Sequence, residues 1–355
     1  MNISIKSFIL LVCFVDFIST QVYNVRDFGA IGDGVTNDTK AVRDAWAAAA
    51  KTNGGRVIFD AGYNFLTAPF NITSNGILDV RGQITASRNR SDYYPIPEVP
   101  CPKLVKLVYT KDIVIQNITL LNSPRWSCAL SYATNVYINH VNITAPYQQM
   151  VINKYGMSND GVNLDCSVNV TIDDYYYIGA GNGVPGQTYG RTSENITITN
   201  ARIDYSGGIG AGVEIAAGVR NVTYRDIIMN NSIKGIKVQS ERMMGGFMED
   251  ISFYNVTLLN VIHPFFFTLN YDHSINGTSN TPEWKNVYLD NIVTDNSTYT
   301  WVMQGTPESW LQNLVLGHIN NTNVQTGYVA SCYNVTGTCN NATVTPYCPS
   351  CIKKV

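Results

Sequence analysis

The sequence has few charged residues, and this scarcity excludes several classes of protein. Charged side chains account for 14% of the 355 residues, and the formal net charge is −2. A protein that binds nucleic acid needs a basic face, so the composition argues against nucleic acid as a partner. Histidine is equally scarce, and His140, His263, His273 and His318 lack the spacing of metal ligands. We therefore expect no metal and no other cofactor.

Long hydrophobic runs are missing except near the N-terminus. Residues 8–17 form an apolar run that follows Lys6 and precedes the small residues Ser19 and Thr20. The run is too short to cross a bilayer, and its pattern is typical of a secretory signal peptide, despite Asp16 within it. We expect residues 1–20 to be a signal peptide and the mature protein to be secreted and extracellular, without a membrane span. The alternative is an N-terminal anchor helix.

Helical periodicity is nearly absent. One segment predicts a helix, because Asn37 and Asp38 precede an Ala-rich stretch that ends before Asn53-Gly54-Gly55. We expect this short helix to cap the open end of a β-structure, where unpaired strand edges would otherwise recruit other chains.

A repeat of short strands is the main positive feature of the sequence. Asn169, Asn195 and Asn221 each begin an Asn-x-Thr strand, and their positions are 26 residues apart both times. A period of this size is typical of a solenoid. Each period lacks the crossover helix that a βαβ sheet needs, so the pattern favours an all-β, single-stranded parallel β-helix. We expect one domain over residues 21–355, with these three strands in register on consecutive coils of one parallel sheet.

The cysteines gather at the C-terminus. Four of the seven that follow the signal peptide lie within a Cys-rich tail at residues 329–355, namely Cys332, Cys339, Cys348 and Cys351. In an oxidising compartment this crowding predicts local disulfides among the four.

Sequons of the form Asn-x-Ser/Thr recur along the chain and mark possible glycan sites in a secreted protein. An Asn in a turn before a β-branched strand is also what a β-coil requires. We therefore expect some of these asparagines to belong to the coil and to carry no glycan. The sequons include Asn71, Asn117, Asn142, Asn169, Asn195, Asn221, Asn255, Asn296 and Asn334.

Several motifs resemble, in this order, the polygalacturonases of glycoside hydrolase family 28. They are YNVRDFGAIGDGVTNDTKA at 23–41, SPRW at 123–126, SNDGVN at 158–163, YGRTSENITITN at 189–200, GVRNVT at 218–223, KGIKVQS at 234–240 and the tail from Cys332 to Cys351. The resemblance covers nearly the whole mature chain. It implies a right-handed parallel β-helix that cleaves α-1,4-linked galacturonan, the acidic polysaccharide of pectin, by inversion.

The resemblance also implies four site motifs on successive coils. Asn-Thr-Asp corresponds to Ser158-Asn159-Asp160, so Asp160 is the candidate catalytic residue. Gly-Asp-Asp corresponds to Gly181-Asn182-Gly183, which has no carboxylate, and Gly-His-Gly to Ser206-Gly207-Gly208, which has no histidine.

The fourth motif, Arg-Ile-Lys, corresponds to Lys237-Val238-Gln239 and keeps one cation. We expect Asn182, Lys237 and Gln239 to bind substrate, with Lys237 pairing a substrate carboxylate. Lys237 could equally be a solvated side chain at a strand end.

Other carboxylates are weaker candidates for the missing acid. Asp174 is more easily explained as a solvated turn residue, and Glu214 as a structural residue. Asp165 has the opposite parity from Asp160, which predicts that it points to the other face of its strand.

Two hypotheses for function follow. The first is a secreted, monomeric hydrolase of pectin or a related acidic polysaccharide, with a degenerate site that relies on Asp160. The second is a non-catalytic protein of the same fold that binds polysaccharide or belongs to a cell wall or coat. A lyase is disfavoured, because the sequence has no carboxylate cluster of the kind that binds calcium.

Overall fold

A computed structural model of the chain describes residues 21–87, 89, 103–121, 123, 126–144, 161–173, 176–179, 187–271, 279–325, 329–339, 343–345 and 348–353. The chain divides into two compact units, residues 1–99 and 100–355. The expectation of a single domain over residues 21–355 therefore stays a prediction.

In its described residues, the first unit is a small β-structure with one α-helix. The helix α1 (Thr39–Lys51) buries Val42, Ala45, Trp46 and Ala49, and it packs against β1 and β3 of this unit. The predicted helix is thus confirmed, and it ends where Asn53 and Gly54 adopt positive φ angles. The other elements are β1 (Val22–Asn24), η1 (Val25–Phe28), β2 (Asp33–Asn37), β3 (Gly55–Phe59), β4 (Asn64–Thr67), β5 (Gly76–Val80) and β6 (Gln83–Ala86).

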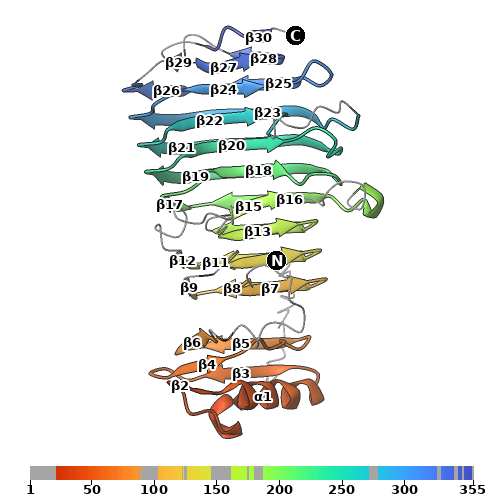
Figure 1. Ribbon diagram of the computed structural model, residues 1–355, viewed down its shortest axis with the longest axis vertical. Helices are drawn as coiled ribbons and strands as arrows, with labels where there is room; N and C mark the ends of the chain where they lie inside the picture. Colours follow the sequence, from red (N-terminus) through yellow and green to blue (C-terminus); the bar gives the residue numbers. More distant parts are fainter. Residues whose placement is uncertain are drawn as a thin grey trace, which may run out of the picture. The chain divides into compact units, whose positions relative to one another are not determined.

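The second unit contains two long parallel sheets, whose strands stack coil upon coil in Figure 1. In the described part of the chain the first of them, which we call sheet A, has nine strands. In stacking order these are β7 (Val105–Val108), β10 (Cys128–Ser131), β13 (Val162–Asp165), β15 (Tyr176–Gly179), β18 (Ile209–Val213), β20 (Lys234–Ser240), β22 (His263–Thr268), β24 (Trp301–Gln304) and β27 (Val329–Tyr333).

The second long sheet, which we call sheet B, has 13 strands among the described residues. Its main path runs through β8 (Lys111–Gln116), β11 (Thr134–Asn139), β14 (Val168–Asp173), β16 (Ser193–Thr199), β19 (Val219–Asn230), β21 (Phe247–Leu259), β23 (Glu283–Asp295), β25 (Leu311–Leu316), β28 (Val335–Cys339) and β30 (Ile352–Lys353). Beside this path lie β17 (Arg202–Asp204), β26 (Ile319–Thr322) and β29 (Val344–Thr345), and a separate pair is formed by β9 (Thr119–Leu121) and β12 (Asn142–Thr144).

Strand alternation explains the core between the sheets. Every second side chain of a strand points to the same face, and the inward positions are Val, Ile, Leu and Phe. Val170, Ile196 and Val222 occupy one register line across β14, β16 and β19, and each is buried. The strands led by Asn169, Asn195 and Asn221 are thus parallel neighbours in register, as predicted. The expected fold, a right-handed parallel β-helix with an N-terminal helix, is confirmed.

Near the start of many strands of sheet B, an asparagine also joins neighbouring coils through its side chain. Asn195 Nδ2 donates to Asn169 Oδ1 at 3.1 Å, and Asn221 Nδ2 donates to Asn195 Oδ1 at 2.7 Å. These residues have φ angles of 51–57°, a left-handed conformation that asparagine and aspartate tolerate better than most residues. We call this series the asparagine ladder; its members are Asp112, Asn135, Asn169, Asn195 and Asn221, followed by Asp250, Asn286 and Asn313.

The Cys-rich tail forms the last coil of the second unit. Cys332 is bonded to Cys351, and Cys339 to Cys348. These are the local disulfides that the spacing of the four cysteines predicted. Cys128 and Cys166 are buried free thiols. Among the described helices, none is both long and apolar enough to cross a membrane.

Candidate functional site

The four predicted site residues divide between described and undescribed parts of the chain. Lys237 and Gln239 lie on β20, in the middle of sheet A. Asp160 and Asn182 lie outside the described residues, so their roles stay predictions.

Lys237 and Gln239 point to the outward face of sheet A. Their neighbours Ile236 and Val238 are fully buried in the core, and the alternation of the strand turns Lys237 and Gln239 the other way. In the register of the sheet, Lys237 stands between Gly210 on β18 and Phe266 on β22. Two of the three residues that we expected to bind substrate therefore share one face.

Gln239 is the more enclosed of the two. It is only 4% exposed, and its Oε1 has no hydrogen-bond partner among the described residues. A buried amide oxygen without a partner costs about 1–3 kcal/mol, so such a group is a natural contact for a polar ligand.

The outward positions of β18 carry no side chains, because they are glycines. Gly210 has a φ of 152° and Gly212 a φ of 131°, and a Cβ on either would lie within 2 Å of a carbonyl oxygen of β20. The two strands approach too closely for any other residue. Gly207, which stands just before this strand, is different, because a Cβ there would meet no atom within 4 Å.

Lys234 is a second cation on this face that the sequence analysis missed. Its Nζ lies 3.7 Å from the centre of the Phe266 ring and 5.4 Å from that of Tyr271, a cation–π arrangement. Burial of the ammonium group, and next the charge of Lys237, lower the pKa of Lys234 to about 8. Residues three apart lie on opposite faces of a regular strand, so the spacing of Lys234 and Lys237 is not a signal that could have found it.

His263 stands opposite Lys234 in the register of β20 and β22. Its ring stacks on Tyr299 at a centroid distance of 4.8 Å. Burial, and then the charge of Lys234, lower its pKa. Both effects favour the neutral form of the imidazole.

Two carboxylates considered from the sequence lie near the same face. Asp165 is the last residue of β13, two positions after Asn163, and both alternate with the buried Val162 and Leu164. Asp165 thus belongs to the outward face of sheet A, and the Cys166 thiol donates to its Oδ1 at 3.4 Å. Glu214 follows β18 and is half-buried, in a tight turn closed by a bond from the Ile215 N–H to the Val213 carbonyl.

A charged clamp lies near the C-terminal ends of β20, β22 and β24. Arg242 Nε donates to Glu308 Oε1 at 2.6 Å, and Thr281 donates to the same oxygen at 3.1 Å. The hydrogen bond from Arg242 holds the pKa of the Glu308 carboxyl at about 2. The clamp ties together segments that follow three successive coils of sheet A.

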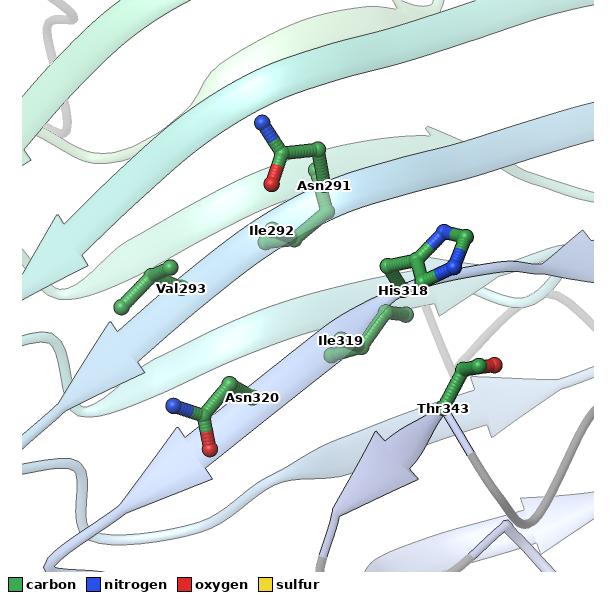
Figure 2. Close-up of a pocket in the computed structure, with 7 residues that line it drawn as sticks. All are labelled: Asn291, Ile292, Val293, His318, Ile319, Asn320 and Thr343. Atoms are coloured by element: carbon green, nitrogen blue, oxygen red, sulfur yellow. The ribbon is translucent and has the colours of Figure 1, made fainter.

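The cavity in Figure 2 lies elsewhere, on sheet B. Asn291 and Val293 from β23 and Asn320 from β26 line it, and its volume is about 170 Å³. His318 at its edge contacts Asp290 at 2.8 Å, and the backbone N–H of His318 holds the pKa of Asp290 low. The cavity is shallow and contains none of the predicted site residues, so we do not assign the site to it.

The stacked coils, with lysines, a buried amide and aromatic rings on the outward face of one sheet, define a right-handed parallel β-helix with a polar site on sheet A. Comparison with known proteins identifies the family. The model of glycosyl hydrolases family 28 matches residues 65–348, and the chain belongs to this family.

Relatives of the chain are polygalacturonases. A probable polygalacturonase of Vitis vinifera is 26% identical over 312 residues, with 69% of this chain and 62% of the relative covered. An endo-polygalacturonase of Pectobacterium carotovorum subsp. carotovorum is 25% identical over 193 residues, with 54% and 46% covered. The chain thus matches less than two thirds of the length of these relatives.

Solved structures agree on the fold. An exopolygalacturonase from Thermotoga maritima superposes with a TM-score of 0.73 at 19% identity, over 87% of this chain and 90% of that one. The polygalacturonase from Erwinia carotovora ssp. carotovora gives a TM-score of 0.61 at 16% identity, over 88% and 97%.

Proposed function

We propose that the protein is a secreted glycoside hydrolase that cleaves a galacturonan-like acidic polysaccharide on the outward face of sheet A. The observation that carries the proposal is the cluster on β20, where Lys234 and Lys237 stand beside the outward-facing glycines of β18 and the ring of Phe266. Cations pair with uronate carboxylates, aromatic rings offer apolar surface to a sugar, and bare glycines allow a close approach to the backbone.

The length of this face suits an oligosaccharide. The strands β13, β15, β18 and β20 are successive neighbours in sheet A, so three coil steps separate Asp160, just before β13, from Lys237. At about 4.8 Å for each step the row extends over roughly 15 Å, which is the length of a few sugar units.

Strand register supports a second carboxylate for the site. Asn163, Tyr177, Gly210 and Lys237 form one line across β13, β15, β18 and β20. In the sequence, the residue three positions before each of them is Asp160, Asp174, Gly207 and Lys234.

This common offset reproduces the order of the family motifs. Asp160 is the aspartate of Asn-Thr-Asp, and Gly207 occupies the histidine position of Gly-His-Gly. By the same offset, the last aspartate of Gly-Asp-Asp corresponds to Asp174 rather than to Asn182 or Gly183. We therefore propose Asp160 and Asp174 as the catalytic pair, with Asn182 outside the reacting centre.

Two carboxyl groups are what inverting hydrolysis requires. One protonated carboxyl donates its proton to the leaving glycosidic oxygen, while the other carboxylate takes a proton from the water that attacks the anomeric carbon from the opposite side. Lys234 and Lys237 would hold the substrate carboxylate during this exchange.

A reducing-end assay on polygalacturonate tests the proposal. Asp160→Asn and Asp174→Asn should each lower kcat by roughly 10²–10⁴-fold, the usual contribution of general acid–base catalysis. Asn182→Ala is the matched control and should leave kcat unchanged. Turnover that survives Asp174→Asn but not Asn182→Ala would return the site to the motif at residues 181–183.

The absence of the motif histidine favours a second candidate, a non-catalytic polysaccharide-binding protein. Gly207 leaves that position without a side chain. In this case wild-type protein would release no reducing ends from polygalacturonate, yet Lys237→Ala would still weaken binding of the polymer, most strongly at low salt. Equal binding by wild type and Lys237→Ala would contradict both candidates.

A further inference from the structure

The structure separates eight of the glycosylation sequons into two classes by what the asparagine side chain does. In the first class the amide is part of the coil-to-coil hydrogen bonding of sheet B. Asn195 both donates to Asn169 and accepts from Asn221. Asn255 likewise donates to Asp226 Oδ1 at 2.7 Å and accepts from Asn291 at 3.1 Å.

Asn296 completes this class. Its Nδ2 donates to Asn260 Oδ1 at 2.7 Å, and its own Oδ1 accepts from Gln325 at 2.8 Å. We call the five sequon asparagines of this class, Asn169, Asn195, Asn221, Asn255 and Asn296, the bonded sequons.

The second class has no such bonds. The side chains of Asn71, Asn117 and Asn142 are exposed, and none of them makes a hydrogen bond within the described part of the chain. We call these three the unbonded sequons. Asn334 belongs to neither class, because its Nδ2 donates to the Gly305 carbonyl at 3.4 Å.

A glycan and a bonded sequon compete for the same amide. Attachment replaces one of the two N–H groups on Nδ2 and places a sugar beside amides about 4.8 Å above and below. The remaining N–H must then keep its bond while the sugar finds room between neighbouring coils.

Asn71 has an additional feature, a cavity of about 360 Å³ at its side. The cavity lies between α1 and the segment 69–73, and its lining includes Trp46, Ala47, Ala50 and Phe70. A first sugar attached to Asn71 can lie over this apolar lining and shield it from water, which is favourable.

We propose that the secreted protein carries N-glycans on Asn71, Asn117 and Asn142 and not on the bonded sequons. The proposal rests on passage through a secretory pathway, which is part of the proposed function, but it does not depend on catalysis. The oligosaccharide is transferred before the chain folds. A chain with a glycan on a bonded sequon would not complete its coils, so the folded, secreted protein should lack glycans at these positions.

The protein is secreted from a eukaryotic host with a heterologous signal peptide, so the test does not depend on where the protein's own N-terminal segment would direct it. Folded, secreted protein is treated with a peptide N-glycosidase in heavy-oxygen water, and peptide mass spectrometry then counts converted asparagines. We expect conversion at Asn71, Asn117 and Asn142 and none at the bonded sequons. Conversion at Asn195 or Asn221 in the folded fraction, or none at Asn71, would overturn the proposal.

Threonine substitutions give matched variants that leave every asparagine in place. Thr73→Val, Thr119→Val and Thr144→Val should each remove the mass of one glycan from the secreted protein. Thr197→Val removes the sequon of Asn195 but keeps its bonds, and it should leave the mass of the glycans unchanged. A glycan lost in Thr197→Val would contradict the proposal even if the other variants behaved as expected.

Discussion

Lys234 reaches from β20 across to the next coil, where its Nζ lies 3.7 Å from the centre of the Phe266 ring. The contact half-buries a cation on the face that also carries Lys237. It makes Lys234 a group whose charge changes within an accessible pH range, because its pKa is about 8.

The first prediction concerns this charge. Lys234→Met should weaken binding of an oligogalacturonate at pH 5 by roughly tenfold, since hydrogen bonds to charged groups contribute about 1.5–3 kcal/mol. The ammonium is charged below its pKa of about 8. The difference in binding affinity between wild type and variant, which we call the gap, should therefore close as the pH rises through 8. Titration calorimetry across pH 5–9 measures the gap.

A control distinguishes the contribution of the Lys234 charge from the contributions of other polar groups nearby, namely Lys237, His263 and Tyr271. Lys237→Met should weaken binding at pH 5 as well, because it also removes a cation from this face. The neutral methyl ester of the same oligosaccharide should bind wild type and Lys234→Met equally. A gap for Lys234→Met that is constant over the whole pH range would contradict the role of this charge.

The second prediction contrasts two glycines. A Cβ at Gly207 meets nothing within 4 Å, whereas a Cβ at Gly212 would overlap the carbonyl oxygen of Gln239. Gly207→His should therefore fold with nearly unchanged thermal stability, and it restores the histidine of the family motif. Gly212→Ala should fail to fold or lose much of its stability. If the protein is a hydrolase, Gly207→His should raise kcat on polygalacturonate. Thermal unfolding measures the stability of the two variants, and the reducing-end assay measures kcat.

The third prediction concerns the clamp between Arg242 and Glu308. Glu308→Gln should lower the free energy of unfolding by about 1–2 kcal/mol at pH 7, towards the lower end of the range for hydrogen bonds to charged groups, because the pair is partly screened by solvent. The folded-state pKa of about 2 lies below the ordinary value of 4.5, so the carboxylate stabilises the protein above pH 4.5. This contribution is lost as the pH falls from 4.5 to 2.

Denaturant unfolding of wild type and Glu308→Gln from pH 7 down to pH 3 measures the contribution. Glu249→Gln is the control, because Glu249 pairs with Lys285, whose side chain is 51% exposed. Exposed pairs contribute less than about 1 kcal/mol. Equal losses in the two variants would show that the clamp stabilises no more than a surface ion pair.

The fourth prediction concerns the asparagine ladder. Asn195→Ala removes two inter-coil bonds and places alanine at a φ of 57°. The bonds contribute about 0.5–1.5 kcal/mol each, and the left-handed conformation adds about 1–2 kcal/mol. Asn195→Gly loses the bonds but accepts the conformation, so it should be less destabilised than Asn195→Ala in denaturant unfolding. The reverse order would show that backbone conformation is not what selects asparagine here.

The strands of sheet B could be predicted from the sequence because their signal is local. An asparagine, a β-branched residue and a threonine recur at Asn169, Asn195 and Asn221, and the same three residues specify the turn, the inward side chain and the outward one. Their register follows, since a shift by one residue would expose every inward side chain. The tail disulfides were predictable for a similar reason, because four cysteines lie within a short segment.

The site on sheet A was harder to predict because its contacts join residues from different coils. The starts of the Asn- or Asp-led strands are 23 residues apart between Asp112 and Asn135 but 36 apart between Asp250 and Asn286. Which residues face each other therefore depends on loop lengths. Lys234 meets Phe266 and His263 only through this register, and the pairing of β15 is what favours Asp174 over Asn182.

The asparagine ladder has a direction along the solenoid, because each Nδ2 donates to the Oδ1 of the preceding coil. An ionised aspartate accepts such a bond but has no N–H to donate, so it can stand only at the first rung of a run, as Asp112 and Asp250 do. Duplication of an asparagine-led coil would lengthen a run without a gap, whereas a duplicated aspartate-led coil would interrupt it. The two aspartates thus mark the starts of two separate hydrogen-bonded runs. Within a run, an asparagine-led coil can be added or removed while the side-chain hydrogen bonds between the remaining coils stay intact.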